Sequence, residues 1–285
     1  SQRTRLRSRD NGSMLPPGLS RLFGRPEEDL DCRRPLVARP IPPYLIRKTP
    51  LNTFLGCYGI YKSLARIFLM RYQKIGDIII LNKKDRETAE RLLAYQPKTK
   101  TVMYRTSPIF GKFREPKLRK LAGNGTVTVH REHGCFFKLD VEKIMWSKGN
   151  HRERVRLVKK VEKGETIIDM FAGIGYFSIP LAKKSGAKKI YSVELNPVAF
   201  SYLLDNIKLN RTRKIKAINA DSGKVEIPEK ADRVLMGLLP SSREYLSKAL
   251  KLVKKGGIIH YHGLDGKEPD NLWKEFEVAC KKRKK

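Results

Sequence analysis

A short apolar strand, a loop with two glycines and a helix follow one another at residues 166–184, and this unit limits the fold more than any other feature of the chain. Residues 166–169 are β-branched and apolar up to a final aspartate, which is typical of a buried parallel strand. Gly173 and Gly175 then permit a tight turn that brings backbone N–H groups close to a ligand. Any tight strand-to-helix turn can carry such a glycine pair, so the glycines alone do not identify the ligand.

A second apolar segment, residues 189–193, ends in Glu194, which stands 19 positions after Gly175 (194 − 175). A carboxylate at this spacing can bind ribose hydroxyls. A dinucleotide-binding loop would have a third glycine where this chain has Ser178, so a pyrophosphate site is disfavoured. The loop matches the D-x-F-x-G-x-G pattern of S-adenosylmethionine enzymes better. The residues expected to contact this ligand are Asp169, Phe171, Ala172, Gly173 and Glu194.

Strand and helix patterns alternate over the C-terminal half of the chain. Helices are expected at residues 172–184, 197–210 and 243–253, and strands near 167 and 190 and at 215–219, 234–237 and 258–261. This alternation predicts an α/β fold, a Rossmann-like doubly wound parallel sheet. Because ligands of such sheets lie beyond the carboxyl ends of the strands, one crevice should contain Asp169, Glu194, Asp221 and residues 237–240.

Asp221 and Ser222 follow the third expected strand, where a carboxylate and a hydroxyl can bind an adenine amino group. Asp221 could instead be a turn or helix-capping residue, because aspartate favours both positions. Gly237 and Pro240 lie in the loop after the fourth strand, where many base methyltransferases hold an exocyclic amine with a polar residue. The glycine argues against methyl transfer, although this loop could also simply cap the next helix.

His260 and His262 flank a tyrosine at a spacing of two and are expected to face one side of the last strand, in a structural or substrate-facing role. They lack a third ligand at metal spacing, so we predict no metal site. His130 and His133 lie at a strand–turn junction and receive no role.

The N-terminal half differs in composition. We expect residues 1–69, rich in Arg, Pro and Gly, to form a disordered or loosely structured extension, and residues 70–145 a small α+β, RNA-binding domain rich in strands. Residues 146–285 would be the ligand-binding domain. Within these domains we predict strands at 75–81, 101–104, 126–130 and 135–140, and helices at 86–95, 141–160 and 271–280.

The formal net charge of +32 arises from 61 Lys and Arg against 29 Asp and Glu in 285 residues. The excess extends along the whole chain, so the expected partner is a polyanion, above all nucleic acid. A heat-adapted, lysine-rich surface is the alternative, but it would carry matching glutamates. Aromatic and cationic residues alternate over residues 110–120, where Lys112 and Arg114 are candidate phosphate contacts or members of a solvated loop.

The four cysteines are scattered without C-x-x-C pairs, which disfavours a zinc site and a disulfide framework and indicates a reducing compartment. No uncharged apolar run of about 18 residues predicts a membrane span. We therefore expect a cytoplasmic protein. The sequence does not indicate an oligomeric state.

Together these residues resemble the family of tRNA wybutosine-synthesising aminocarboxypropyltransferases, which are relatives of the tRNA guanine N1-methyltransferases that act beside the anticodon. The similarity covers about residues 71–262 and depends on residues 71–77, 111–116, 133–150, 169–180, 236–242 and 260–262. The resemblance implies S-adenosylmethionine as group donor and the anticodon region of phenylalanine tRNA as partner. It also implies donor contacts from Ser147, Arg154, Glu194, Asp221 and Ser222.

Two segments distinguish the two families. The methyltransferases have an arginine in a Ser-Pro-Arg-Leu-like segment and an Asn-Leu-Pro loop, where this chain has residues 147–150 and 237–240. Both differences favour transfer of the aminocarboxypropyl group to 4-demethylwyosine. A guanine N1-methyltransferase and a non-catalytic tRNA-binding protein are the alternatives. Family members continue beyond the fifth strand with a helix and two further strands, so the resemblance implies a domain shortened at its C-terminus.

Overall fold

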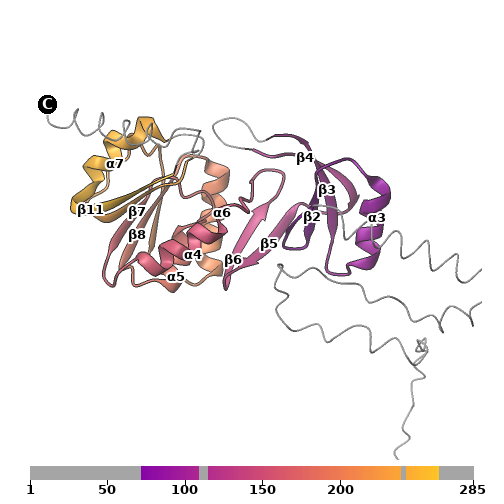
Figure 1. Cartoon of the computed structure of the whole chain (residues 1–285), viewed down its shortest axis with the longest axis horizontal. Coiled ribbons are helices and arrows are strands. Elements are labelled where there is room, and N and C mark those ends of the chain that lie inside the picture. The colour runs from indigo at the N-terminus through magenta and orange to yellow at the C-terminus, as the bar shows by residue number, and fades with distance from the viewer. Residues whose placement is uncertain (1–71, 109–114, 239–241, 263–285) are drawn as a thin grey trace, which may run out of the picture. The chain divides into compact units, whose positions relative to one another are not determined.

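The computed structural model describes residues 72–108, 115–238 and 242–262, which all belong to one compact unit, Tyr61–Lys285. A five-stranded sheet in the order β11-β10-β7-β8-β9 dominates the C-terminal part (Figure 1). All its neighbouring strands are parallel. Its strands are β7 (Thr166–Asp169), β8 (Lys189–Glu194), β9 (Ile215–Asn219), β10 (Ala231–Met236) and β11 (Val253–Tyr261). The strand order reverses between β7 and β10, which confirms the doubly wound sheet and fixes its ligand-binding edge.

Helices cover both faces of this sheet because side chains along each strand alternate between the faces. Ile167 of β7 packs in one cluster with α4 (His151–Lys160) and α5 (Ser178–Lys184). Its neighbour Ile168 packs in another cluster with α7 (Leu246–Leu252), which follows a short 3₁₀ turn, η2 (Arg243–Tyr245). Burial on both faces explains why residues 166–169 form a continuous apolar run.

From residue 72 onward, the described residues of the preceding part form a four-stranded sheet in the order β1-β2-β3-β4 and the helix α3 (Arg86–Tyr95). The strands are β1 (Tyr72–Ile75), β2 (Ile78–Leu81), β3 (Thr101–Ser107) and β4 (Lys117–Gly123). Helix α3 connects the parallel strands β2 and β3. Its N-cap is Asp85, whose side chain accepts a hydrogen bond from the backbone N–H of Thr88 at 2.9 Å.

A separate hairpin, β5 (Val127–Glu132) and β6 (Cys135–Asp140), lies between the two sheets in the chain and contacts β1 of the four-stranded sheet and α5 beside the five-stranded sheet. Asn206 and Asn210 of α6 (Pro197–Leu209 with Asn210 as C-cap) bind the backbone of β6. Phe137 and Leu139 of β6 are fully buried in a core that includes Ile174 from the glycine loop. The hairpin is therefore part of the packing around the expected ligand loop.

Several predicted boundaries were wrong. Residues 75–81 are not one strand but the end of β1, a turn at residues 76–77 and β2, because Gly76 adopts φ +56° and reverses the chain. The helix expected at 141–160 begins only at His151, since residues 141–150 form turns. Likewise, α5 begins at Ser178 and not at residue 172, and the helix expected to reach residue 253 ends at Leu252. Strand β4 was missed, because its charged residues lack an apolar alternation.

The regions expected to be an extension (1–69) and a last helix (271–280) lie outside the described residues. No helix in the described ranges is long and apolar enough to cross a membrane.

Candidate functional site

The carboxyl ends of four neighbouring strands bring the predicted ligand residues to one edge of the parallel sheet. Asp169 ends β7 and Glu194 ends β8, while Asp221 follows β9 and Gly237 follows β10. Asp169 pairs in register with Ser192 on one side and Leu235 on the other. This edge, with the loops that follow it, is called the sheet-edge site below.

Asp169 is completely buried, and one of its carboxylate oxygens is already used by the protein. Its Oδ2 accepts a hydrogen bond from the Ser178 hydroxyl at 2.6 Å, and Ser178 in turn accepts one from Ser192 at 2.7 Å. Its Oδ1 has no hydrogen-bond partner among the described residues. Burial raises the pKa of Asp169 to about 6, and the Ser178 hydroxyl together with the nearby backbone N–H groups of Phe171 and Ser178 opposes that rise. An unpartnered buried acceptor of this kind is suited to a ligand donor.

The backbone of the glycine loop is hydrogen-bonded to the Glu194 side chain. Gly173 adopts φ +56°, and its N–H donates to Glu194 Oε2 at 2.7 Å. The Asn196 N–H donates to Glu194 Oε1, also at 2.7 Å. Burial raises the pKa of Glu194, and these two backbone hydrogen bonds oppose that rise. The carboxylate is thereby held at the end of β8, with lone pairs left for ribose hydroxyls.

Phe171 forms the other side of the loop and packs edge-on against Tyr245, with ring centroids 4.9 Å apart. Ala172 is buried, and its N–H donates to the Val193 carbonyl at 2.9 Å, which fixes the loop on β8. The two rings offer an apolar surface suited to a purine base.

Asp221 and Ser222 differ in whether a side-chain oxygen remains without a protein partner and can bind a ligand. Asp221 Oδ1 accepts from the Gly223 N–H at 2.8 Å in a turn, as the turn alternative expected. The Ser222 hydroxyl is buried and donates to the Met170 carbonyl. The hydroxyl therefore has a structural partner, whereas the second Asp221 oxygen has none described.

Arg154 is the largest of the fully buried side chains, and it links α4 to the hairpin and to Ser147. Its Nε and Nη2 donate to the two oxygens of Glu132 at 2.7 and 3.1 Å. Nη2 also donates to the Ser147 carbonyl at 3.1 Å, and the guanidinium lies 5.2 Å from the Trp146 ring centroid. Only Nη1 lacks a partner among the described residues. The arginine thus holds the Ser147 segment and keeps one free N–H donor.

Gly237 and His262 lie together at the end of β10. A Cβ on Gly237 would approach the Phe177 ring to 3.2 Å and His262 Nδ1 to 3.9 Å. His262 stacks on Phe177 with centroids 5.4 Å apart, and its Nε2 lies 3.3 Å from Glu153 Oε1. The glycine therefore leaves the edge of this aromatic pair without a side chain at position 237.

The two histidines that were expected to share a side have different partners. His260 Nε2 lies 2.8 Å from Arg233 Nη1, and burial together with this arginine lowers the His260 pKa to about 4. His260 is therefore neutral at physiological pH and accepts a hydrogen bond from Arg233, which favours its structural role. His262 lies beside Gly237, and its substrate-facing role stays a prediction.

The sheet-edge site fits an S-adenosylmethionine ligand chemically. A methionine moiety carries an ammonium donor and a carboxylate acceptor, which are complementary in polarity to Asp169 Oδ1 and Arg154 Nη1, two of the buried side-chain atoms without a hydrogen-bond partner in the described residues. A Cβ on Gly173 would lie 2.6 Å from the Tyr176 ring, so the loop conformation requires glycine.

One group of possible metal ligands, Glu132, His133 and His151, has ligand atoms within 4.8 Å of one another in the described part of the chain. Both Glu132 oxygens already accept from Arg154, so this carboxylate is committed to the arginine. The predicted absence of a metal site remains a prediction. Lys112, Arg114 and Pro240 lie outside the described residues.

Four residues of the site were not found from the sequence: Glu132, Glu153, Phe177 and Tyr245. Glu132 lies 22 positions before its partner Arg154, and no local pattern joins them. Phe177 stands in the quoted loop motif, and its apolar character next to the glycines was the available signal.

Comparison with known proteins gives consistent results. Residues 128–285 match the TRM5/TYW2 methyltransferase domain. The chain is 46% identical over 193 residues to a tRNA(Phe) (4-demethylwyosine(37)-C(7)) aminocarboxypropyltransferase of Methanocaldococcus jannaschii, covering 68% of this chain and 78% of that protein. It is 36% identical to a tRNA (guanine(37)-N(1))-methyltransferase, Trm5b of Pyrococcus abyssi, over 77% of this chain and 67% of that protein. The crystal structure of M. jannaschii TYW2 in complex with AdoMet superposes with a TM-score of 0.62 at 37% identity, covering 74% of this chain and 85% of that one.

Proposed function

Because the chain belongs to the TRM5/TYW2 family, we propose that it is an S-adenosylmethionine-dependent tRNA aminocarboxypropyltransferase. It transfers the 3-amino-3-carboxypropyl group to 4-demethylwyosine, a tricyclic guanine derivative, in wybutosine-type tRNA modification. We further propose that the base lies next to the anticodon of phenylalanine tRNA, as the name of the M. jannaschii relative states for that protein.

The observation that carries this proposal is the pair of buried, unpartnered atoms Asp169 Oδ1 and Arg154 Nη1. An acceptor and a donor left free in a folded protein cost stability unless a ligand satisfies them. Their polarity matches the two ends of an amino acid. The identity to the aminocarboxypropyltransferase relative, 46% against 36% for the methyltransferase, supports the same choice.

S-adenosylmethionine supplies a sulfonium centre with three electrophilic carbons, so the orientation of the bound donor decides which group is transferred. In our proposal, Glu194 binds the ribose hydroxyls, and Phe171 with Asp221 binds the adenine. Arg154 and Asp169 bind the amino-acid end and thereby set the orientation. Arg154 can do this reproducibly, because Glu132 and the Ser147 carbonyl fix its guanidinium.

Gly237 and His262 are proposed to accept the tricyclic base. A polar residue at position 237 would reach the Phe177 ring and reduce this space. Methylation of an unmodified guanine requires a donor or base at that position, whereas a larger ring system requires room.

The test is a product analysis with two labels. Protein is incubated with S-adenosylmethionine labelled either in the methyl or in the aminocarboxypropyl group, together with phenylalanine tRNA that carries 4-demethylwyosine. We expect methylthioadenosine as the small product, and tRNA labelled only from the aminocarboxypropyl donor. S-adenosylhomocysteine with methyl-labelled tRNA would identify a methyltransferase instead. Binding of tRNA without measurable donor affinity by calorimetry would identify a non-catalytic tRNA-binding protein.

A further inference from the structure

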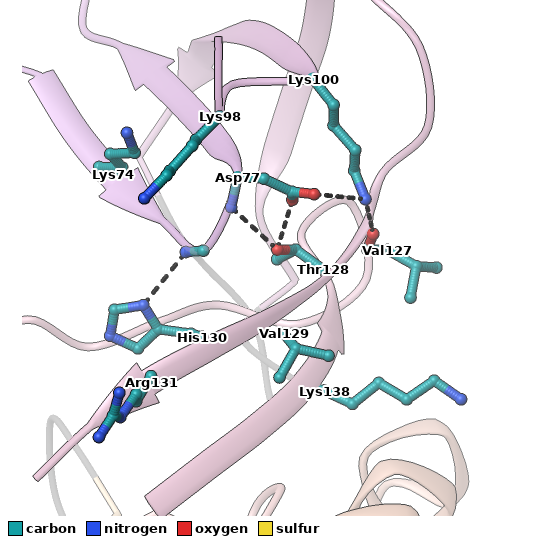
Figure 2. Close-up of a pocket in the computed structure, with 11 residues that line it drawn as sticks. Lys74, Asp77, Lys98, Lys100, Val127, Thr128, Val129, His130, Arg131 and Lys138 are labelled. Atoms are coloured by element: carbon teal, nitrogen blue, oxygen red, sulfur yellow. Dashed lines mark hydrogen bonds and ion pairs between the residues drawn. The ribbon is translucent and has the colours of Figure 1, made fainter. Parts of the chain in front are cut away.

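A cavity far in sequence from the glycine loop lies between the four-stranded sheet and the β5–β6 hairpin. Its volume is about 770 Å³. Figure 2 shows Lys74, Lys98 and Lys100 on the sheet side of the opening and Arg131 and Lys138 on the hairpin side. We call it the basic pocket. Its lining residues are Lys74, Gly76, Asp77, Lys98, Lys100, Val127, Thr128, Val129, His130, Arg131 and Lys138.

The floor of the basic pocket is rigid. Gly76 approaches β5 so closely that a Cβ would lie 2.1 Å from Thr128 Oγ1. The Gly76 N–H donates to His130 Nδ1 at 3.2 Å, and the Thr128 hydroxyl donates to Asp77 Oδ1 at 2.6 Å (Figure 2). The cations therefore surround a preformed hollow.

The charge of the lining is strongly unbalanced. Five cations and one carboxylate, Asp77, line the pocket; Lys100 lies 3.3 Å from Asp77, and Lys138 pairs with Asp205 outside the lining at 2.8 Å. Lys98 and Arg131 are exposed, and neither contacts a carboxylate within the described ranges. Cations that lie near one another without a carboxylate partner repel one another, so an anionic occupant would stabilise Lys98, Arg131 and their neighbours.

Apolar and neutral groups of the lining indicate what kind of anion fits. Val127 and Val129 are 41% and 46% exposed, an unusual position for β-branched side chains among cations. Burial lowers the pKa of His130, so its ring is neutral. Because His130 Nδ1 accepts from Gly76, its proton lies on Nε2, where it can donate. A small ion would use only the charges, whereas a chain of phosphates and sugars uses charges, donors and apolar surface together.

We propose that the basic pocket binds the phosphodiester backbone of the tRNA, with Lys98 and Arg131 as direct phosphate contacts. This inference rests on the proposed function for the choice of tRNA among polyanions. The pocket adds a contact outside the sheet-edge site, on the sugar–phosphate chain and not on the base.

The hairpin explains how such a contact could serve the reaction. Lys138 lines the basic pocket, and its backbone N–H donates to Asn206 Oδ1 at 2.6 Å. Asn206 Nδ2 in turn donates to the Ile174 carbonyl, between the two loop glycines, at 3.0 Å. One asparagine therefore joins the basic pocket to the glycine loop. RNA held in the pocket would be held in a fixed relation to the donor.

The test measures RNA binding apart from group transfer. The double variant K98Q/R131Q removes two exposed cations of the lining that have no carboxylate partner in the described ranges, and K83Q/K84Q is the matched control. Lys83 and Lys84 are exposed in the same part of the chain and lie outside the pocket lining. Affinity for a phenylalanine tRNA transcript is measured by filter binding from 50 to 400 mM KCl. For two lost phosphate contacts, the slope of log K against log salt should decrease by about 1.5, and affinity near 0.1 M salt should fall about 30-fold.

The outcomes separate the two proposals. Unchanged tRNA affinity in K98Q/R131Q, an equal loss in K83Q/K84Q, or no tRNA binding by the native protein would overturn the basic pocket. Binding of inorganic phosphate at millimolar concentration that K98Q/R131Q abolishes while tRNA affinity is unchanged would identify a small-anion site and also overturn it. Donor affinity, measured by calorimetry, should be the same in all variants. If the native protein forms no methylthioadenosine but K98Q/R131Q still loses tRNA affinity, only the proposed function fails.

Discussion

Asn206 offers the sharpest single test of how the hairpin is attached to the ligand-binding sheet. Its side chain is fully buried and makes three hydrogen bonds to backbone groups. It accepts from the Lys138 N–H at 2.6 Å, and it donates to the Lys138 carbonyl at 3.2 Å and to the Ile174 carbonyl at 3.0 Å. Replacement by alanine leaves all three groups without this partner.

At roughly 1 kcal/mol for each group left unpaired, N206A should lower the free energy of unfolding by about 3 kcal/mol. For a folded unit of this size, that corresponds to a decrease of about 6–12 °C in Tm. Urea unfolding followed by circular dichroism measures the loss as a lower midpoint with an unchanged m value. N219A is the matched control. Asn219 is exposed and donates to the Glu194 carbonyl at 2.7 Å, so water can replace it and the cost should stay below about 1 kcal/mol.

The isosteric variant N206D adds a pH signature. Its carboxylate keeps the acceptor for the Lys138 N–H but faces the two carbonyl oxygens, so burial and repulsion raise the pKa of the new carboxyl above its unfolded value. The variant should therefore lose stability as pH rises and regain part of it as pH falls through the folded-state pKa. A loss below 1 kcal/mol in N206A, or a pH-independent N206D, would refute the role of Asn206 as a buried hydrogen-bonding link.

Three further predictions concern the sheet-edge site. The pKa of Asp169 is about 6 against a usual 3.8, so its ionisation should cost the native protein roughly 3 kcal/mol as pH rises from 4 to 7; the difference between native and D169N unfolding curves measures this, and a constant difference contradicts it. E132A leaves the buried Arg154 guanidinium without its carboxylate and should cost about 3–5 kcal/mol in chemical unfolding, whereas a loss near zero would mean that water reaches the arginine. G175A forces a side chain into φ +96° and should cost about 1–3 kcal/mol, while the control G149A, with open space around Gly149, should melt like the native protein.

The sequence pattern predicted those helices and strands whose periodicity and capping residues lie within the segment itself. Helix α3 and strands β6 and β9 lie at the predicted residues, because their alternation or capping is complete within each segment. The turn at Gly76 was read as strand because apolar residues flank it on both sides. Strand β4 pairs with β3 despite its charges, and only the pairing reveals it.

Some residues of the sheet-edge site could likewise be predicted from local patterns, whereas others depend on tertiary packing. The strand-end positions of Asp169 and Glu194 follow from the parallel sheet, so they could be derived before the fold was known. The partner of Arg154 could not, because Glu132 belongs to a hairpin that approaches α4 only through tertiary packing. The basic pocket likewise gathers residues 74–138 from separate elements, and the sequence indicated only a general excess of positive charge.

The hydrogen bonds between β6 and α6 also affect how the chain folds while it is being synthesised. The backbone N–H groups of Lys138 and Phe136 in β6 donate to Asn206 and Asn210, which follow them in the sequence by 68 and 74 residues. At a synthesis rate of about 5–20 residues per second, roughly 3 to 15 seconds pass before these asparagines are made. During that interval the outer edge of the hairpin has unpaired N–H and C=O groups, which can pair with another strand. The newborn chain is therefore most prone to wrong pairing after β6 is complete and before α6 has formed.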